Sequence, residues 1–216
     1  MAERVTHPYT LGIALLYDAM LHLDRGDPQL ALARLDAAEA LAAEQRLGFV
    51  MEPRFLRGAA LSAQGAFEDA VACLRERLAG PLGATHARPY ALAETSVRQG
   101  EHGAALAAAR EGLRSQEEIG QGRWEAELHR LEGIALFGLD RIEDAQNALE
   151  QALRIARSQQ AKSYELRAAT SLARLWGEQG RRAEARELLA PVYGWFTEGF
   201  DTADLKEAAA LLDELA

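Results

Sequence analysis

The stretch ARLWGEQGRRAEARELL, residues 173–189, decides the fold of this chain. Ala173 is followed seven positions later by Gly180, and Ala185 and Leu189 come five and nine positions after that glycine. Glycine permits a tight turn between two helices, and small residues let the two helices cross closely. This spacing therefore favours a helical hairpin with its turn at Gly180.

The same spacing recurs along the chain, with successive turn residues 39, 35, 40 and 40 positions apart. Each copy has a small residue seven positions before the turn, an alanine five positions after it, and usually a leucine four positions later. Five copies in register predict an all-α repeat protein, because each hairpin buries its apolar face against its neighbours. The turn residues are Gly26, Gly65, Gly100, Asp140 and Gly180, and the small residues are Ala19, Gly58, Ala93, Gly133 and Ala173.

This frame is that of a tetratricopeptide-like (TPR-like) repeat, so we expect a single domain over residues 1–216. It should contain five antiparallel hairpins stacked as a right-handed solenoid, with a capping helix over 202–215. Locally, Asp27 is expected to cap a helix that begins at Pro28. The glycines and prolines of residues 78–89 predict a longer loop there.

Composition limits the function classes. The formal net charge of −9 argues against non-specific binding to nucleic acid or to an anionic membrane. Cys73 is the only cysteine, which excludes an internal disulfide and a cysteine-based zinc site. The apolar run LGIALL (11–16) is too short for a membrane span. We therefore expect a soluble, cytoplasmic protein without a direct nucleic-acid or membrane partner.

The aromatic residues near the C-terminus allow two interpretations, a binding surface or a hydrophobic seal of the last repeat. Helical spacing favours the seal and predicts that one helix runs through Pro191 and Gly194. Trp195 and Phe196 should then continue its buried face, and Gly199 should end the helix in a left-handed conformation. Asp201 or Thr202 is expected to cap the final helix.

Two stretches, RWEAELHRLEGIAL (123–136) and residues 161–216, resemble the C-terminal repeat region of large bacterial regulators. Those regulators join an adenylate cyclase or a DNA-binding domain to a signal-transduction ATPase, followed by TPR-like repeats. The resemblance implies a sensory or scaffolding module, and this chain is then either a fragment or a short relative. No phosphate-binding glycine loop or cyclase aspartate pattern is present in the sequence, so the family's enzymatic activity is not carried over.

Glu125, His129 and Glu132 lie on adjacent turns of one expected helix, which makes a metal site one possible interpretation. A helical di-iron site needs Glu-x-x-His from two helices. Here one helix carries the reverse order, so packing and ion pairing are favoured. No convergent acid, base or nucleophile is evident, and we expect neither catalytic activity nor a cofactor.

The first helices of stacked hairpins should line a concave groove, whose positions can be counted back from each turn residue. Apolar residues at one end and arginines at the other favour an acidic-hydrophobic peptide or an anionic ligand. The alternative is that the arginines pair with neighbouring glutamates on a solvated face. The predicted lining is Met20, Phe55, Tyr90, Glu94, Arg98, Arg130, Phe137, Arg167 and Arg174.

These observations favour a non-enzymatic interaction module of a bacterial signalling or transcriptional regulator, with a protein or peptide partner. The alternative is a sensor that binds a small metabolite or a short peptide in the groove. Unpaired arginines in a buried pocket would favour the sensor. The apolar stretch LGIALLYDAMLHL (11–23) further predicts a homodimer through the N-terminal repeat.

Overall fold

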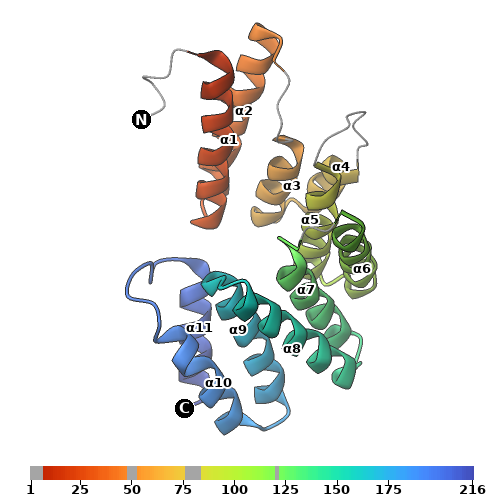
Figure 1. Cartoon of the computed structure of the whole chain (residues 1–216), viewed down its shortest axis with the longest axis vertical. Coiled ribbons are helices and arrows are strands. Elements are labelled where there is room, and N and C mark those ends of the chain that lie inside the picture. Colours follow the sequence, from red (N-terminus) through yellow and green to blue (C-terminus); the bar gives the residue numbers. More distant parts are fainter. Residues whose placement is uncertain (1–6, 48–52, 76–83, 120–121) are drawn as a thin grey trace. The chain divides into compact units, whose positions relative to one another are not determined.

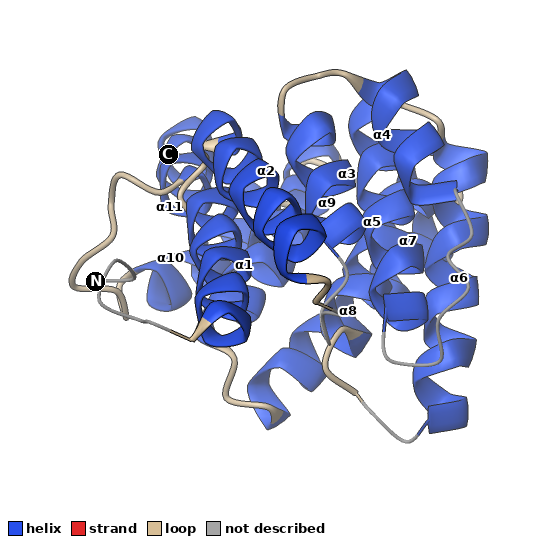
Figure 2. Cartoon of the chain, turned by 90° about the horizontal axis from the view of Figure 1, so that it is seen from above, coloured by secondary structure: helices blue, strands red, loops and turns tan. Residues whose placement is uncertain are grey.

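The computed structural model describes residues 7–47, 53–75, 84–119 and 122–216. Within these ranges the chain forms eleven helices and no strand (Figures 1 and 2). The helices are α1 (Pro8–Asp24), α2 (Pro28–Gln45), α3 (Pro53–Ala63), α4 (Phe67–Arg75), α5 (Ala84–Gln99), α6 (His102–Ile119), α7 (Glu125–Gly138), α8 (Ile142–Ser158), α9 (Lys162–Glu178), α10 (Arg182–Tyr193) and α11 (Ala203–Glu214).

The chain divides into two compact units, residues 1–95 and 96–216. In the first unit α1 packs on α2, α2 on α3 and α3 on α4, and α1 also contacts α3. In the second unit each of the helices α6 to α11 packs on the next one along the chain. Two further contacts join α7 to α9 and α9 to α11. The expectation of a single domain over 1–216 stays a prediction.

The five turn residues of the repeat frame all have a left-handed backbone. The φ angle is +78° to +80° at Gly26, Gly65, Gly100 and Gly180, and +59° at Asp140. Aspartate tolerates this conformation better than most residues with a side chain, although glycine adopts it at less cost. A left-handed residue therefore separates the two helices of each hairpin.

The small residues of the frame lie where two helices touch. A Cβ atom added to Gly58 would lie 2.5 Å from Leu74 Cγ, and one added to Gly133 would lie 2.6 Å from Leu149 Cγ. These distances are far below the 3.5–4.0 Å of an ordinary carbon–carbon contact. The close approach of the helices at these two positions thus requires glycine.

Alanines and leucines fill the interior of both units. The five alanines that follow the turns are all fully buried: Ala31, Ala70, Ala105, Ala145 and Ala185. Around them the largest core, in the second unit, is formed by α7 to α11 and includes Leu149, Leu172 and Leu189. Because alanine has a small side chain, neighbouring helices can approach one another closely where it is buried between them.

Two local predictions fall near helix starts. Asp27 is the N-cap of α2, and its side chain accepts a hydrogen bond from the Leu30 N–H at 3.2 Å. The predicted loop over 78–89 is wrong in its second half, because α5 begins at Ala84 and contains Pro89. Pro89 is the sixth residue of this helix, beyond its first turn, so its missing N–H removes one i→i−4 hydrogen bond. Residues 78–83 lie outside the described residues.

The C-terminal aromatic segment differs from its prediction. Helix α10 ends at Tyr193, and Gly194 is its C-cap, so the predicted continuation through Gly194 is wrong. The next two N–H groups donate to carbonyls three residues earlier, Trp195 to Val192 and Phe196 to Tyr193. Bonds with this spacing form a tighter turn than the α-helix and end it here.

Burial in this segment also departs from the prediction. Phe196 packs against the core, whereas Trp195 is 58% exposed and is not part of the seal. Gly199 has a positive φ, as predicted. It does not end the helix, however, because α10 already ends at Tyr193.

Helix α11 covers the last hairpin by packing on α9 and α10. Leu205, Ala208, Leu211 and Leu215 are buried, while Asp213 and Glu214 are exposed. Thr202 is the N-cap residue, but its hydroxyl donates to the Gly199 carbonyl instead of capping the helix. The exposed face of α11 is therefore polar.

Candidate functional site: a charged ladder on the first helices

In the second unit the first helices of successive hairpins contact one another directly, α7 with α9 and α9 with α11. Polar side chains cross both of these contacts. We call this set the charged ladder, and it consists of Glu127, Arg130, Arg167, Arg174, Asp204 and Glu207.

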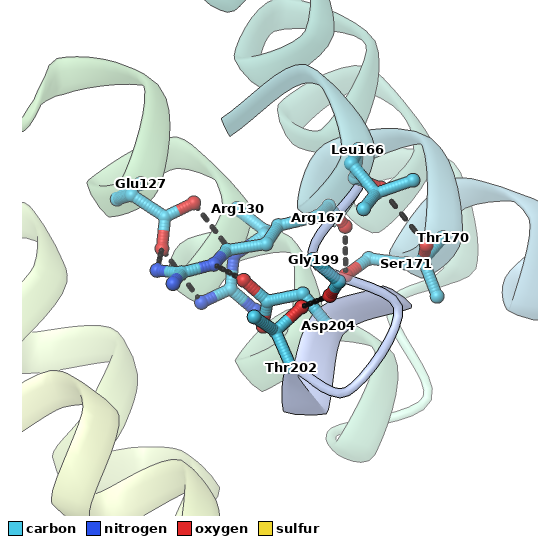
Figure 3. Close-up of polar contacts among 9 residues, drawn as sticks. All are labelled: Glu127, Arg130, Leu166, Arg167, Thr170, Ser171, Gly199, Thr202 and Asp204. Atoms are coloured by element: carbon cyan, nitrogen blue, oxygen red, sulfur yellow. Dashed lines mark hydrogen bonds and ion pairs between the residues drawn. The ribbon is translucent and has the colours of Figure 1, made fainter. Parts of the chain in front are cut away.

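Glu127 on α7 is the centre of the ladder (Figure 3). Its side chain is fully buried, and both carboxylate oxygens accept hydrogen bonds from Arg130, from Nε and from Nη2, each at 2.9 Å. Arg167 Nη1, from α9, donates to the same carboxylate at 3.3 Å. A bidentate arginine on a buried carboxylate is among the stronger polar contacts in proteins.

Arg167 extends the network to α11. Its Nε donates to Asp204 Oδ2 at 2.6 Å, while its Nη1 contacts Glu127 (Figure 3). One guanidinium group therefore joins three first helices. Because loss of one partner leaves a buried charge uncompensated, this part of the ladder holds the helices together.

The pKa of Glu127 lies below its ordinary value. Burial alone would raise this pKa, but the positive charges of Arg130 and Arg167 and their hydrogen bonds lower it by more. Glu127 is therefore ionised at neutral pH despite its burial.

The Arg174–Glu207 pair is different, because it is open to solvent. Arg174 Nη2 lies 2.9 Å from Glu207 Oε1, and the two side chains are 45% and 57% exposed. Exposed pairs of this kind contribute about 0–1 kcal/mol. The pair thus orients the Arg174 side chain, but little free energy is lost when Arg174 exchanges Glu207 for another acceptor.

The other predicted groove residues lie in varied surroundings. Met20 and Phe55 pack partly against the core of the first unit, and Phe137 packs against that of the second. Tyr90 is buried, Glu94 is half-buried and Arg98 is exposed. The structure brings Arg130 and Arg167 together on one carboxylate and places Arg174 two turns further along α9. The binding role of the nine residues stays a prediction.

The acidic members of the ladder were not predicted. Glu127 lies three residues before Arg130, a helical spacing at which such pairs meet, so local spacing could have identified it. Asp204 and Glu207 lie on α11 and pair with arginines of α9. Their pairing with α9 depends on how α11 docks, which residue spacing within α11 does not reveal.

The candidate metal-site segment on α7 forms ion pairs. Glu132 contacts Arg110 Nε at 2.9 Å and His129 Nδ1 at 3.4 Å. The hydrogen bond with His129 and the pairing with Arg110 lower the pKa of Glu132, against the effect of its partial burial. Among the described residues there is no group of three or more histidine, cysteine or acidic side chains suited to a metal ion.

Two shallow hollows lie on the second unit, and the ladder lines neither of them. One, of about 240 Å³, is lined by Lys162, Pro191 and Trp195 among others. The other, of about 280 Å³, surrounds His129 and Glu132.

The fold is similar to that of two crystal structures of a putative kinesin light chain from Podosopora anserina with nearly identical TPR-like repeats. Both are 21% identical to this chain, with TM-scores of 0.57 and 0.56, and the match covers 88% of this chain and 96% of the other. The predicted all-α, TPR-like repeat fold is thereby confirmed. No protein-family model and no curated protein matches the sequence. Of the helices that the structure describes, none has the length and apolar character needed to cross a membrane.

Proposed function

We propose that this chain is a non-enzymatic interaction or scaffolding module that binds an extended acidic-hydrophobic segment of a partner protein across the charged ladder. The observation that carries the proposal is the exposed Arg174–Glu207 pair at 2.9 Å. Its guanidinium group is already oriented, and a partner carboxylate can replace Glu207 as its acceptor. Phe137, predicted to line the same face, offers an apolar contact.

The energetics of exchange favour Arg174 over the other ladder arginines. Replacement of Glu207 gives up an exposed ion pair of about 0–1 kcal/mol. Replacement of Glu127 would expose or strand a fully buried carboxylate, which costs about 3–5 kcal/mol. Arg130 and Arg167 therefore stabilise the module, and Arg174 is the arginine available to a partner.

We further propose that the module belongs to a cytoplasmic bacterial signalling or transcriptional regulator. This rests on the resemblance of residues 123–136 and 161–216 to the repeat region of such regulators. All six ladder residues fall within those two stretches.

A sensor function is the weaker alternative. A metabolite site would be expected to hold unpaired arginines in a buried pocket. Arg130, Arg167 and Arg174 instead pair with acidic residues of the chain, and neither hollow contains them.

The test is a peptide array of short extended sequences that combine Glu or Asp with Leu or Phe, each paired with its amide counterpart. Fluorescence anisotropy of the tightest binder with the intact protein should show weaker affinity for Arg174→Gln, by about tenfold, since a charge-assisted hydrogen bond is lost. The matched control is Arg141→Gln, whose pair with Asp144 is also exposed, at 46% and 51%, but lies at the start of α8, away from the ladder. The proposal fails if no acidic peptide binds more tightly than its amide counterpart, or if both variants weaken binding equally.

A further inference from the structure

The hollow of about 240 Å³ on the second unit has an apolar lining beside charged side chains. The apolar part consists of Leu188, Pro191, Val192 and Trp195, and we call this feature the Trp195 hollow. Trp195 is 58% exposed, which is unusual because tryptophan is highly buried on average. Tryptophan is also over-represented among the residues that dominate binding energy at interfaces, so its exposure beside a hollow marks a candidate binding site.

Positive charge gathers at the Trp195 end of the hollow. Lys162 Nζ lies 5.4 Å from the centroid of the Trp195 ring and donates to Glu165 Oε2 at 2.7 Å. Arg157 Nε donates to the other oxygen of the same carboxylate, Oε1, at 2.9 Å. Burial alone would raise the pKa of Glu165, but the hydrogen bonds from Lys162 and Arg157 lower it by more, so Glu165 is ionised at neutral pH. Two cations therefore share one carboxylate, which leaves an excess of one positive charge at this end.

Arg157 is placed to bind a further acceptor. Its side chain is 52% exposed, whereas that of Glu165 is only 8% exposed. The contact between them is made by Nε, and a guanidinium group carries four more N–H donors on its two Nη atoms. An incoming carboxylate can therefore pair with Arg157 while the contact with Glu165 is kept.

The carboxylate of Glu187 gives the other end of the hollow a negative charge. Glu187 is exposed and lies on α10, six residues before the helix ends at Tyr193. Six residues correspond to about 9 Å along a helix, and Trp195 lies two residues further on. The hollow thus has a positive and a negative end, with Leu188 and Val192 between Glu187 and Trp195 along the chain.

We propose that the Trp195 hollow binds an extended peptide segment of a partner protein that carries an acidic residue, an apolar residue and a basic residue at alternate positions. The acidic residue pairs with Arg157 and Lys162, the apolar residue packs on Trp195 and its apolar neighbours, and the basic residue pairs with Glu187. In an extended chain the residues i, i+2 and i+4 point to the same side, and the outer two lie about 13 Å apart. This spacing matches the separation of the two charged ends.

The separation of charge in the hollow argues against other peptide occupants. A segment that is acidic at both ends would place one carboxylate beside Glu187. A segment that is basic at both ends would place one cation beside Arg157 and Lys162. Like charges brought together across an interface weaken binding, so a segment with opposite charges at its ends matches the hollow better than either.

This inference does not rest on the proposed peptide site, because no residue of the charged ladder lines the hollow. Arg174→Gln should leave binding at the hollow unchanged. Loss of one kind of binding without the other would therefore separate the two proposals.

The test is a titration of the intact, isotope-labelled chain with capped pentapeptides, followed by the indole N–H signal of Trp195. The mixed-charge probes are Glu-Ser-Phe-Ser-Arg and its reverse, and the like-charge probes are Glu-Ser-Phe-Ser-Glu and Arg-Ser-Phe-Ser-Arg. The chain has three tryptophans, so Trp195→Phe assigns the signal, and the signals of Trp124 and Trp176 report that the fold is intact. We expect a mixed-charge probe to bind with a Kd on the order of 1 mM, and the like-charge probes to bind at least about fivefold more weakly.

Charge reversal at the negative end provides the sharpest variant. Glu187→Lys should weaken binding of the mixed-charge probe by about fivefold and strengthen binding of Glu-Ser-Phe-Ser-Glu by a similar factor. The matched control is Glu111→Lys, because Glu111 is exposed on α6 and lines neither hollow. This control should leave both affinities unchanged.

Four outcomes overturn the proposal. The first is that no probe shifts the Trp195 signal in a saturable way at about 10 mM, a concentration well above the expected Kd. The second is equal affinity for mixed-charge and like-charge probes, and the third is an equal effect of Glu187→Lys and Glu111→Lys. The fourth is a Trp195 signal that shifts with protein concentration alone, because a second copy of the chain would then occupy the hollow.

Discussion

Replacement of Gly133 by alanine tests whether the hairpins are held together at their small residues. The added Cβ would lie 2.6 Å from Leu149 Cγ, 2.8 Å from Leu149 Cδ2 and 3.1 Å from the Ala145 carbonyl oxygen. Leu149 can turn aside only within a close-packed core, and the carbonyl belongs to the backbone of α8. The helices α7 and α8 must therefore separate, or Leu149 must leave its preferred rotamer.

The expected loss follows from two opposing effects. Overpacking of this kind costs about 1–3 kcal/mol. The exchange of glycine for alanine within a helix returns up to about 1 kcal/mol. In the first and fifth hairpins the frame has Ala19 and Ala173 at this position, and both are fully buried, so other copies of the frame accommodate an alanine there. We therefore expect Gly133→Ala to lower the free energy of unfolding by about 1–2 kcal/mol.

The assay is urea unfolding followed by far-UV circular dichroism, with Gly103→Ala as the control. A Cβ at Gly103 meets no atom within 4 Å, so this variant should keep or gain stability, by up to about 0.5 kcal/mol. The double variant Gly133→Ala, Leu149→Ala should cost less than the sum of the single variants, because the smaller side chain removes the clash. If Gly133→Ala is as stable as the wild type, the close contact does not exist.

Three further outcomes follow from the described contacts. At the left-handed turns, Gly180→Ala should lose about 1–2 kcal/mol of unfolding free energy in urea, whereas Asp140→Gly should gain about 0.5 kcal/mol. Glu127→Gln should lose about 3 kcal/mol, since it removes the acidic member of a buried pair. The folded-state pKa of Glu127 is depressed from 4.5, so the stabilisation by its carboxylate is present above that pH and is lost as the pH falls through the folded-state pKa. In thermal melts across this acid range, the melting temperature of Glu127→Gln should therefore depend less on pH than that of the wild type. Arg174→Gln should change stability by less than about 1 kcal/mol, while Arg167→Gln should cost about 3 kcal/mol, and equal losses in calorimetry would contradict the distinction.

Much of the fold can be predicted from the sequence because its determinants are local. A glycine, a small residue and an alanine at fixed spacing specify the turn and the crossing of two helices, and five copies remove most of the ambiguity. The left-handed φ at Gly26 and at Asp140, and the tight contact at Gly133, are the physical counterparts of that spacing.

The end of α10 could not be predicted in the same way. Apolar spacing continues through Trp195 and Phe196, but a periodic pattern does not show that the chain leaves the helix after Tyr193. Once it does, the two aromatic side chains part, so that Phe196 packs on the core and Trp195 is exposed. In a helix that continued through these positions, Trp195 and Phe196 would both lie on the buried side. In the loop that the chain forms instead, adjacent side chains can point in different directions.

The candidate site was predicted in part. Counting back from the turns identified Arg130, Arg167 and Arg174, but did not identify Asp204 or Glu207 as their partners. Those contacts join residues 33 and 37 positions apart and exist because α11 docks on α9. The distinction between a buried and an exposed arginine, on which the functional proposal depends, therefore requires the tertiary structure.

The measurement that tests the central claim most directly is the affinity of Glu207→Gln for the acidic peptide selected on the wild-type protein. Removal of this carboxylate takes away the competitor for Arg174 and leaves the buried part of the ladder unchanged. The account predicts tighter binding than wild type by about threefold to tenfold, lost again when Arg174→Gln is added. Unchanged or weaker binding by Glu207→Gln would contradict it, because Arg174 would then not be the group that receives the partner.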